Sequence, residues 1–298
     1  MPTEAAIPYA GVELGGTKCV AILARGPDGI LAREVMPTRS PEDTLGGLKR
    51  IIIEWNQRFG IEALGIASFG PVDVDPNSPT FGQILSTPKP GWTGCDVAGE
   101  LSRGLDAPIA FDTDVNGAAL AEMRWGAGQG FEDFAYITVG TGVGAGLIVN
   151  GEPTRGFAHS ELGHIRVAKL AGDAFNGICP FHGDCVEGLA SGPAIKARIG
   201  DRNVDGLSTD DPIWEPVAWT IAQLCHAMVC AAAPRAIAIG GGVIDGQPHL
   251  LGRIENMLVE SLNGYVELPS GAPYIRAPGL GVDAGPLGAI ALAMNAKR

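Results

Sequence analysis

The segment 177–188, GICPFHGDCVEG, contains residues that could bind a metal ion. Cys179, His182 and Cys185 are separated by two residues each, a spacing that a tight loop can fold around one ion. A structural zinc site needs four sulfur or nitrogen ligands, so a fourth would have to come from elsewhere in the chain. The spacing alone is equally consistent with an ordinary loop holding two reduced thiols. It does not indicate a redox pair, which would need the C-x-x-C arrangement that lowers a thiol pKa.

Three glycine-rich segments could bind a nucleotide, because backbone N–H groups without a nearby Cβ can converge on a phosphate. One such turn alone is better explained as a hairpin turn, whereas three favour a nucleotide site, although neither a Walker loop nor a G-x-G-x-x-G helix start occurs. The first turn also offers a carboxylate, Glu13, which could hold Mg²⁺. The candidate nucleotide residues are Glu13, Gly15, Gly16, Thr17, Lys18, Gly140, Thr141, Gly142, Gly240, Gly241 and Gly242, the last three for the adenosine.

Asp114 is a candidate general base. Phosphoryl transfer to an alcohol needs a metal-neutralised nucleoside triphosphate and a carboxylate that takes the proton of the alcohol. In the segment 108–126, PIAFDTDVNGAALAEMRWG, Asp114 lies at the junction of an expected strand and an expected helix. The residue alone is equally consistent with a helix cap.

The elements that must position these residues alternate between strands and helices, which predicts the α/β class. Two similar strand–glycine turn–strand segments, 9–25 and 135–149, predict two lobes of related architecture, each offering one glycine turn to a shared cleft. The other expected elements are a helix over 45–59, a strand and turn over 64–73, a loop or short strands over 72–94, a helix over 216–234, a strand over 235–242 and a small-residue helix at the C-terminus.

Length and charge restrict the class of protein. A chain of 298 residues favours two lobes over one. The net charge of −12 disfavours partners such as nucleic acid or an anionic membrane. Without an export signal or an apolar span, we expect a cytoplasmic protein with reduced cysteines. The cysteines outside the quoted segment are expected to be buried small hydrophobes: Cys19, Cys95, Cys225 and Cys230.

The order of the motifs resembles the ROK family of sugar kinases, and its bacterial fructokinase branch in particular. The motifs are GVELGGTK, FDTDVNGAALAE, TVGTGVGAGLIVNG, HSELGHIRV with the Cys/His segment, and IAIGGGV. The resemblance implies the actin-like, ribonuclease-H-like ATPase fold with an interlobe cleft. The expected lobes are residues 1–118, completed by a C-terminal helix 284–298, and residues 119–283. We expect no N-terminal DNA-binding domain of the kind that the family's repressors carry.

The resemblance also implies roles for individual residues. Asp114 would be the base that deprotonates the C6 hydroxyl of a hexose, which the resemblance implies to be fructose, with ATP and Mg²⁺ as partners. His164 would complete a structural Zn²⁺ site with Cys179, His182 and Cys185, while its other ring nitrogen contacts the sugar. The remaining sugar-binding residues would be Gly70, Pro71, Asp73, Thr113, Glu161 and Glu187.

Several alternatives stay open. Trp92 could pack on the sugar or lie in the core, His159 could be a spare ligand or a sugar contact, and Lys89 receives no catalytic role. Glucose, mannose or an N-acetylated amino sugar could be the substrate, and the chain could instead be a sugar sensor or a zinc-dependent hydrolase. Relatives are commonly dimers, so a homodimer is expected.

Overall fold

The computed structural model describes residues 6–296, which divide into two compact units. Within the described part, unit 1 contains residues 6–126, 154–159 and 282–296, and unit 2 contains residues 127–153 and 160–281. The ends of the lobe predicted from the sequence, residues 1–5 and 297–298, lie outside the described residues. The predicted lobe boundaries, 118/119 and 283/284, stay a prediction.

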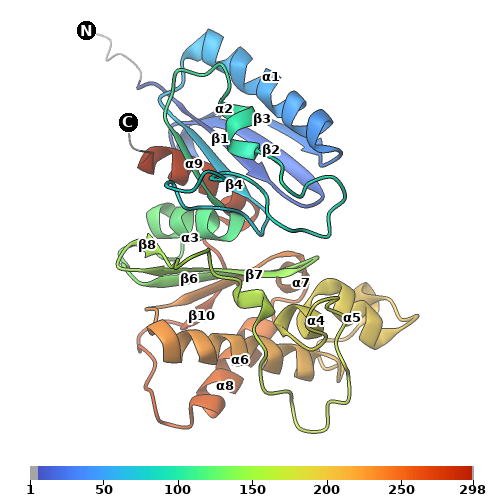
Figure 1. The fold of residues 1–298 in the computed structure, drawn as a ribbon. Coiled ribbons are helices and arrows are strands. Elements are labelled where there is room, and N and C mark those ends of the chain that lie inside the picture. The colour runs from blue at the N-terminus through green and yellow to red at the C-terminus, as the bar shows by residue number, and fades with distance from the viewer. Residues whose placement is uncertain (1–5, 297–298) are drawn as a thin grey trace. The chain divides into compact units, whose positions relative to one another are not determined.

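Unit 1 is built on a five-stranded mixed sheet in the order β3-β2-β1-β4-β5 (Figure 1). Its strands are β1 (Tyr9–Leu14), β2 (Lys18–Ala24), β3 (Ile30–Pro37), β4 (Leu64–Ser68) and β5 (Ile109–Thr113). Strands β1, β4 and β5 run parallel, and β2 and β3 are antiparallel to their neighbours. All three parallel strands therefore end at the same edge of the sheet.

Helices cover both faces of this sheet because successive side chains of a strand point to opposite faces. On one face, Ala10, Val12 and Leu14 of β1 share a core with α1 (Pro41–Phe59) and α2 (Val97–Ser102). On the other face, α9 (Ala284–Asn295) packs on β1 and β4 and against α3 (Asp114–Trp125). Gly65 allows this close approach, because a Cβ there would lie 1.9 Å from the carbonyl oxygen of Ala289.

Unit 2 repeats the same strand order. Its sheet runs β10-β9-β6-β7-β8, and its hairpin β6–β7 is antiparallel while β6, β9 and β10 are parallel. The strands are β6 (Phe134–Val139), β7 (Val143–Val149), β8 (Glu152–Pro153), β9 (Ile237–Gly240) and β10 (Ile275–Arg276). The helices are α4 (Val186–Ala190), α5 (Gly192–Ile199), α6 (Trp214–Ala232), α7 (Gly242–Gly246) and α8 (Leu250–Leu262). The core lies between this sheet and α6 and α8.

The repeated topology confirms the predicted α/β class and the two related hairpins. In unit 1, β1 of the hairpin pairs in parallel with β4, and β4 pairs in parallel with β5. In unit 2, β6 pairs in the same way with β9, and β9 with β10. The expected segments around 45–59, 64–68, 108–126, 216–234 and 235–242 are also present as helices and strands of the predicted type. β3 and α8 were not among the predicted elements.

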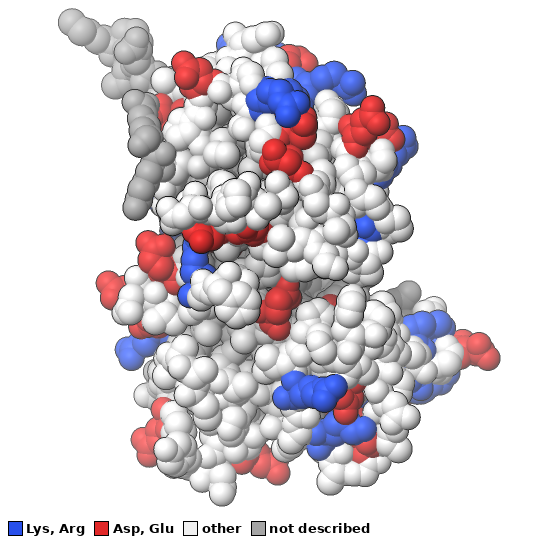
Figure 2. Space-filling model, viewed as in Figure 1, with Lys and Arg blue, Asp and Glu red and all other residues white. Residues whose placement is uncertain are grey.

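Two surface properties bear on the expected partners. On the face drawn in Figure 2, lysine and arginine side chains form small groups among acidic and neutral residues, so this face offers no broad basic surface. Within residues 6–296, none of the helices combines the length and the apolar character that crossing a membrane requires. The cysteine prediction was partly wrong, because Cys230 is exposed and Cys95 is half-buried, whereas Cys19 and Cys225 are buried.

Candidate active site

The candidate residues of unit 1 lie at one edge of its sheet. Leu14 pairs with Ser68, and Ser68 pairs with Thr113, so β1, β4 and β5 end in the same row. The first glycine turn, the 69–73 loop and Asp114 each follow directly from one of these strand ends. The backbone N–H of Phe69 also donates to the carbonyl of Leu14 at 2.8 Å. Residues far apart in the sequence are thereby brought to one edge, where parallel α/β sheets commonly bind ligands.

The first glycine turn is tight and supported from one side. The Gly15 N–H donates to the Lys18 carbonyl at 3.1 Å, and a Cβ on Gly15 would lie 2.6 Å from that oxygen. The hydroxyl of Thr38, which directly follows β3, donates to the Gly15 carbonyl at 2.7 Å. By contrast, Gly16 is exposed, and a Cβ there would meet no atom within 4 Å. Space next to Gly16 is therefore open to an approaching phosphate.

Glu13 is a half-buried carboxylate beside this turn. It lies against the first turn of α9, where a Cβ on Gly285 would be 2.2 Å from its Oε1 atom. Burial raises the pKa of Glu13, and the positive charges of Lys18 and Arg33 partly offset this effect. A divalent cation at this carboxylate would favour its charged form in the same way, so the site fits the expected Mg²⁺ role chemically.

Asp114 does not cap α3. The N-cap is Thr113, whose hydroxyl accepts a hydrogen bond from the Asn116 N–H at 3.2 Å, and Thr113 is buried. The Asp114 Oδ1 atom accepts from the Val115 N–H at 2.9 Å, and the residue is only half-buried. The capping interpretation of Asp114 is therefore wrong, because the preceding residue performs that task. The Thr113 hydroxyl is already engaged in the cap, so its predicted contact with a sugar remains a prediction.

Sequence reasoning missed a buried polar network behind Asp114. Asp112 is 2 % exposed, and its Oδ1 accepts from the Thr113 N–H and from the Asn116 side-chain amide, both at 2.7 Å. Its Oδ2 forms an ion pair with Arg155 at 3.1 Å. These bonds fix the backbone that presents Asp114. The signal was the first aspartate of FDTD, Asp112, but its partner Arg155 lies 43 positions away and could not be inferred from the sequence.

The 70–73 loop is held by its own side chains and by His159. Gly70–Pro71 is a cis peptide bond, and the Val72 N–H donates to Nε2 of buried His159 at 3.0 Å. The Asp73 carboxylate accepts from the hydroxyls of Ser78 and Thr80 at 2.5 and 2.6 Å, and these bonds lower its pKa. Asp73 therefore stabilises its own turn, and its predicted sugar contact stays untested.

Trp92 lies in the core, which resolves the alternative left open by the sequence. It is fully buried, and its indole N–H donates to the Arg39 carbonyl at 3.1 Å. Its ring packs edge-on against Phe69, with 5.4 Å between the ring centroids. Trp92 thus anchors the 87–94 loop beside the edge that carries the candidate residues.

In unit 2, the second and third glycine clusters lie next to each other. Thr138 pairs with Gly240, so β6 and β9 end in the same row, and a Cβ on Gly140 would lie 3.9 Å from the Gly242 nitrogen. Gly241 has φ +91° and would clash with Val139 if it carried a side chain. The two clusters predicted to bind one nucleotide are therefore adjacent at one end of this sheet.

Glu187 connects the second glycine turn to the expected metal ligands. Its Oε2 accepts from the Val143 N–H at 3.1 Å, and a Cβ on Gly142 would lie 2.5 Å from the same oxygen. Its Oε1 lies 4.0 Å from Nε2 of His164. Glu161, two residues before Gly163, is exposed, and its carbonyl accepts from the His164 N–H at 3.0 Å.

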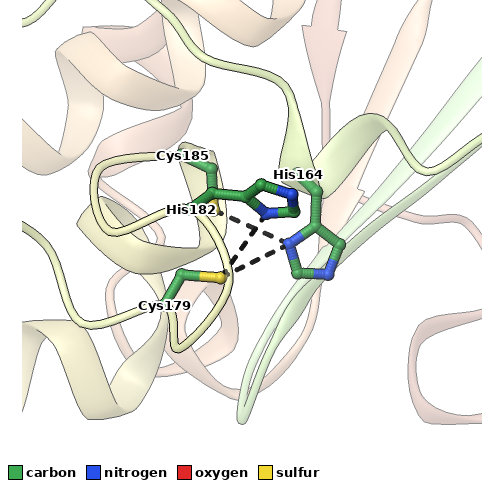
Figure 3. Close-up of side chains that lie close together, drawn as sticks. All are labelled: His164, Cys179, His182 and Cys185. Carbon is green, nitrogen blue, oxygen red and sulfur yellow. Dashed lines mark hydrogen bonds between the residues drawn. The ribbon is translucent and has the colours of Figure 1, made fainter. Parts of the chain in front are cut away.

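The four expected metal ligands form one cluster (Figure 3). Their ligand atoms all lie within 4.8 Å of one another. The Cys179 sulfur is 3.7 Å from Nδ1 of both His164 and His182, and the Cys185 sulfur is 3.6 Å from Nδ1 of His164. Tetrahedral zinc with bonds of about 2.3 Å to sulfur and 2.0 Å to nitrogen places these atoms about 3.6 Å apart. Three of the six pairs of ligand atoms therefore already have the spacing of a zinc site, and the donor set fits zinc.

Local structure explains how a short loop achieves this geometry. Cys179 and Gly183 exchange two backbone hydrogen bonds, at 3.1 and 2.9 Å, which close a tight turn around His182. Cys185 precedes α4 and accepts a hydrogen bond from the Gly188 N–H at 3.5 Å. Burial raises the pKa of the Cys185 thiol to about 11, and the nearby Cys179 thiol adds to the effect. A bound metal ion would have to displace that proton, as zinc does at cysteine sites.

Comparison with known proteins identifies the family. A model of the ROK family matches residues 9–296. The chain belongs to the ROK family. A ROK hexokinase from Thermus thermophilus superimposes with a TM-score of 0.78 at 28% identity, covering 97% of this chain and 98% of that one. A ROK glucokinase from Streptomyces griseus, solved with glucose and AMPPNP, gives 0.75 at 28% identity, covering 97% and 99%.

Among ROK proteins, fructokinases are strongly similar to this chain. A fructokinase from Lactococcus lactis is 40% identical over 91% of each chain, and one from Zymomonas mobilis is 40% identical over 97% of each. The family predicted from the motifs is confirmed. The predicted fold class is confirmed as well, because the ROK hexokinase and glucokinase structures have the actin-like ATPase fold and the two sheets agree with it.

Proposed function

We propose that this chain is an ATP-dependent fructokinase that phosphorylates the C6 hydroxyl of D-fructose. The observation that carries the proposal is the identity of about 40% to several fructokinases along nearly the whole chain. The edge formed by Leu14, Ser68 and Thr113 supports it, because the first glycine turn, the 69–73 loop and Asp114 all follow directly from this row of strand ends.

In this proposal, Asp114 accepts the proton of the sugar hydroxyl. Asp114 is half-buried at the first turn of α3, and Thr113 rather than Asp114 caps that helix. Asp112, held by Arg155, orients the backbone on which Asp114 stands. Gly15 to Lys18 bind phosphate oxygens, and Glu13 holds Mg²⁺, which neutralises the charge of the triphosphate.

The residues of unit 2 bind the rest of the nucleotide and the sugar. Gly140 to Gly142 bind phosphate, and Gly240 to Gly242 lie against the adenosine, consistent with the adjacency of the two clusters. Glu161, His164 and Glu187 accept hydrogen bonds from sugar hydroxyls. A structural zinc ion at the His/Cys cluster fixes His164, and through it the neighbouring Glu187. Four protein ligands leave no open position, which argues against a zinc hydrolase.

A panel of hexoses tests the proposal. Other ROK relatives include a glucokinase from Halalkalibacterium halodurans and a kanosamine kinase from Amycolatopsis mediterranei, at 28% and 29% identity. Fructose, glucose, mannose and N-acetylmannosamine are therefore compared in a coupled assay of ADP release with Mg-ATP. We expect kcat/KM for fructose to exceed that for every other sugar by at least about tenfold, a difference of about 1.4 kcal/mol in transition-state binding. Preference for another hexose would contradict the fructose assignment, and no turnover with any hexose would favour a sugar sensor.

A further inference from the structure

Lys89 is placed at the first glycine turn by a contact that the sequence does not reveal. Its ammonium donates a hydrogen bond to the Gly16 carbonyl at 2.5 Å, although the two residues lie 73 positions apart. The same ammonium is 5.8 Å from the centre of the Phe69 ring. Since Phe69 follows β4 directly, Lys89 lies at the strand edge that also carries the turn and Asp114.

The loop around Lys89 restricts where its side chain can reach. Pro88 and Pro90 flank it and fix two backbone φ angles. The Lys89 carbonyl accepts from the Trp92 N–H at 3.2 Å, and Trp92 is buried and bonded to the Arg39 carbonyl. A buried anchor three residues away therefore holds the base of this lysine, which reduces the entropy lost when its ammonium binds a ligand.

The charge of Lys89 has no acidic partner within the described residues. No carboxylate lies within ion-pair distance of its ammonium, and its one hydrogen bond in this part of the chain goes to Gly16. An ammonium can donate three hydrogen bonds, so two remain for a ligand. In a chain with a net charge of −12, an unpaired cation beside an open glycine turn is well suited to attract an anion.

We propose that Lys89 is a catalytic residue whose ammonium contacts the phosphoryl group during its transfer. This inference rests on the proposed kinase function. In the reaction, the bond from the γ-phosphorus to the bridging oxygen of ADP breaks, a bond to the sugar oxygen forms, and the hydroxyl proton passes to Asp114. Lys89 keeps its proton throughout. Its fixed positive charge stabilises the negative charge on the transferring oxygens, together with Lys18 from the turn itself.

A purely structural role is the competing explanation, because the bond to Gly16 could serve only to hold the turn. Two substitutions separate the roles. Lys89→Gln keeps an N–H donor for the Gly16 carbonyl but removes the charge, whereas Lys89→Arg keeps the charge. We expect Lys89→Gln to lower kcat/KM for ATP by about 10²-fold, in the range seen when one donor to a transition-state oxygen is lost. Lys89→Arg should restore at least a tenth of the wild-type value, and the melting temperature of both should stay within about 2 °C of wild type.

Lys196→Met provides the matched control. Lys196 is an exposed lysine on α5 that also donates to a backbone carbonyl, that of Arg202 at 3.1 Å, and it lies outside the proposed sites. Its substitution should leave kcat/KM for ATP within about twofold of wild type. A Lys89→Gln enzyme as active as this control would overturn the proposal, and so would a Lys89→Arg enzyme as inactive as Lys89→Gln.

A binding measurement keeps this test separate from the proposed function. Calorimetric titration with Mg-ATP in the absence of sugar measures how much the charge of Lys89 contributes to nucleotide affinity, even if no hexose is turned over. We expect the Kd for Mg-ATP to rise by about fivefold or more in Lys89→Gln and to be unchanged in Lys196→Met. If the wild type proves inactive on every sugar, the kinase proposal fails. An unchanged Kd in Lys89→Gln would then overturn the assignment of Lys89 as well.

Discussion

The charged form of Glu13, at the edge of the unit 1 sheet, lowers the stability of the folded state but is required for the proposed chemistry. Glu13 is half-buried, and burial raises its pKa, which means that the folded state disfavours its charged form. The proposed reaction needs that charged form to hold Mg²⁺. A stabilising substitution at Glu13 is therefore expected to reduce activity, as is common at active sites.

The pH dependence of the free energy of unfolding tests whether burial destabilises the charged Glu13 carboxylate. Because its pKa is raised on folding, the native state retains a proton that the unfolded state releases at about pH 4.5. Stability therefore falls as the pH rises from that value through the folded pKa, and the loss is complete above it. We expect Glu13→Gln to gain stability relative to wild type as the pH rises from 4.5 to 8, measured by urea unfolding, and to lose activity.

Glu54→Gln is the control for that experiment, since Glu54 lies exposed on α1. This variant removes one carboxylate without removing a buried one, so a gain in stability that only Glu13→Gln shows is due to the burial of Glu13. A difference between Glu13→Gln and wild type that stayed constant over this range would show that burial does not penalise the Glu13 carboxylate.

At the scale of elements, the structure depends on how closely α9 approaches the sheet of unit 1. A Cβ on Gly65 would lie 1.9 Å from the Ala289 carbonyl oxygen and 2.6 Å from the Ala293 nitrogen, both backbone atoms of α9. Backbone atoms cannot move aside as a side chain can. We expect Gly65→Ala to destabilise the protein by about 1–3 kcal/mol, the typical cost of overpacking.

Gly46→Ala, a substitution on α1, is expected to stabilise the protein, whereas Gly65→Ala on β4 is expected to destabilise it. Gly46 lies within α1, and a Cβ there would meet no atom within 4 Å. Alanine should stabilise the protein by about 0.5–1 kcal/mol, because glycine is a poor helix former. Urea denaturation of both variants measures the difference. Equal stabilities would mean that α9 does not lie on Gly65 as closely as described.

The His/Cys cluster gives the second prediction at this scale. We expect purified protein to contain one zinc ion per chain by mass spectrometry of metals, and Cys179→Ser to contain less than about a tenth of that amount. Because His164 lies near Glu187, metal loss should raise the KM for fructose by about tenfold, within the range found for residues that support metal sites. The exposed thiol variant Cys230→Ser should match wild type in both measurements. Full zinc content in Cys179→Ser would exclude that sulfur as a ligand.

Sequence patterns predicted elements well where apolar runs flank a glycine turn. Both hairpins, β1–β2 and β6–β7, have mostly buried residues on each side of the turn. β3 was missed because it is an edge strand whose side chains are mostly exposed, so it lacks such a pattern. α8 was missed although Leu250, Ile254, Leu258 and Leu262 recur every four residues and are all buried, which was a usable helical signal.

At the scale of the whole molecule, the sequence motifs indicated the family and the His/Cys cluster. They did not indicate the long-range contacts that position residues of the candidate active site. The four ligands lie within 22 positions of one another, whereas Arg155 and Asp112 lie 43 positions apart and Lys89 and Gly16 lie 73 apart. Such pairs depend on how strands and loops are packed, which a single sequence does not encode locally. The expected homodimer also stays a prediction, which light scattering in solution can test.

The repeated strand order gives the molecule two related units, and we assign the proton transfer of the proposed reaction to one carboxylate in the first. The most direct test is the turnover of Asp114→Asn with fructose and Mg-ATP. We predict that kcat falls by about 10²–10⁴-fold, the usual contribution of a general base, while the Kd for fructose changes by less than about threefold. Asp106→Asn, an exposed aspartate before β5, should retain wild-type kcat. An Asp114→Asn enzyme that kept more than a tenth of the wild-type kcat would contradict the role of Asp114 as the base.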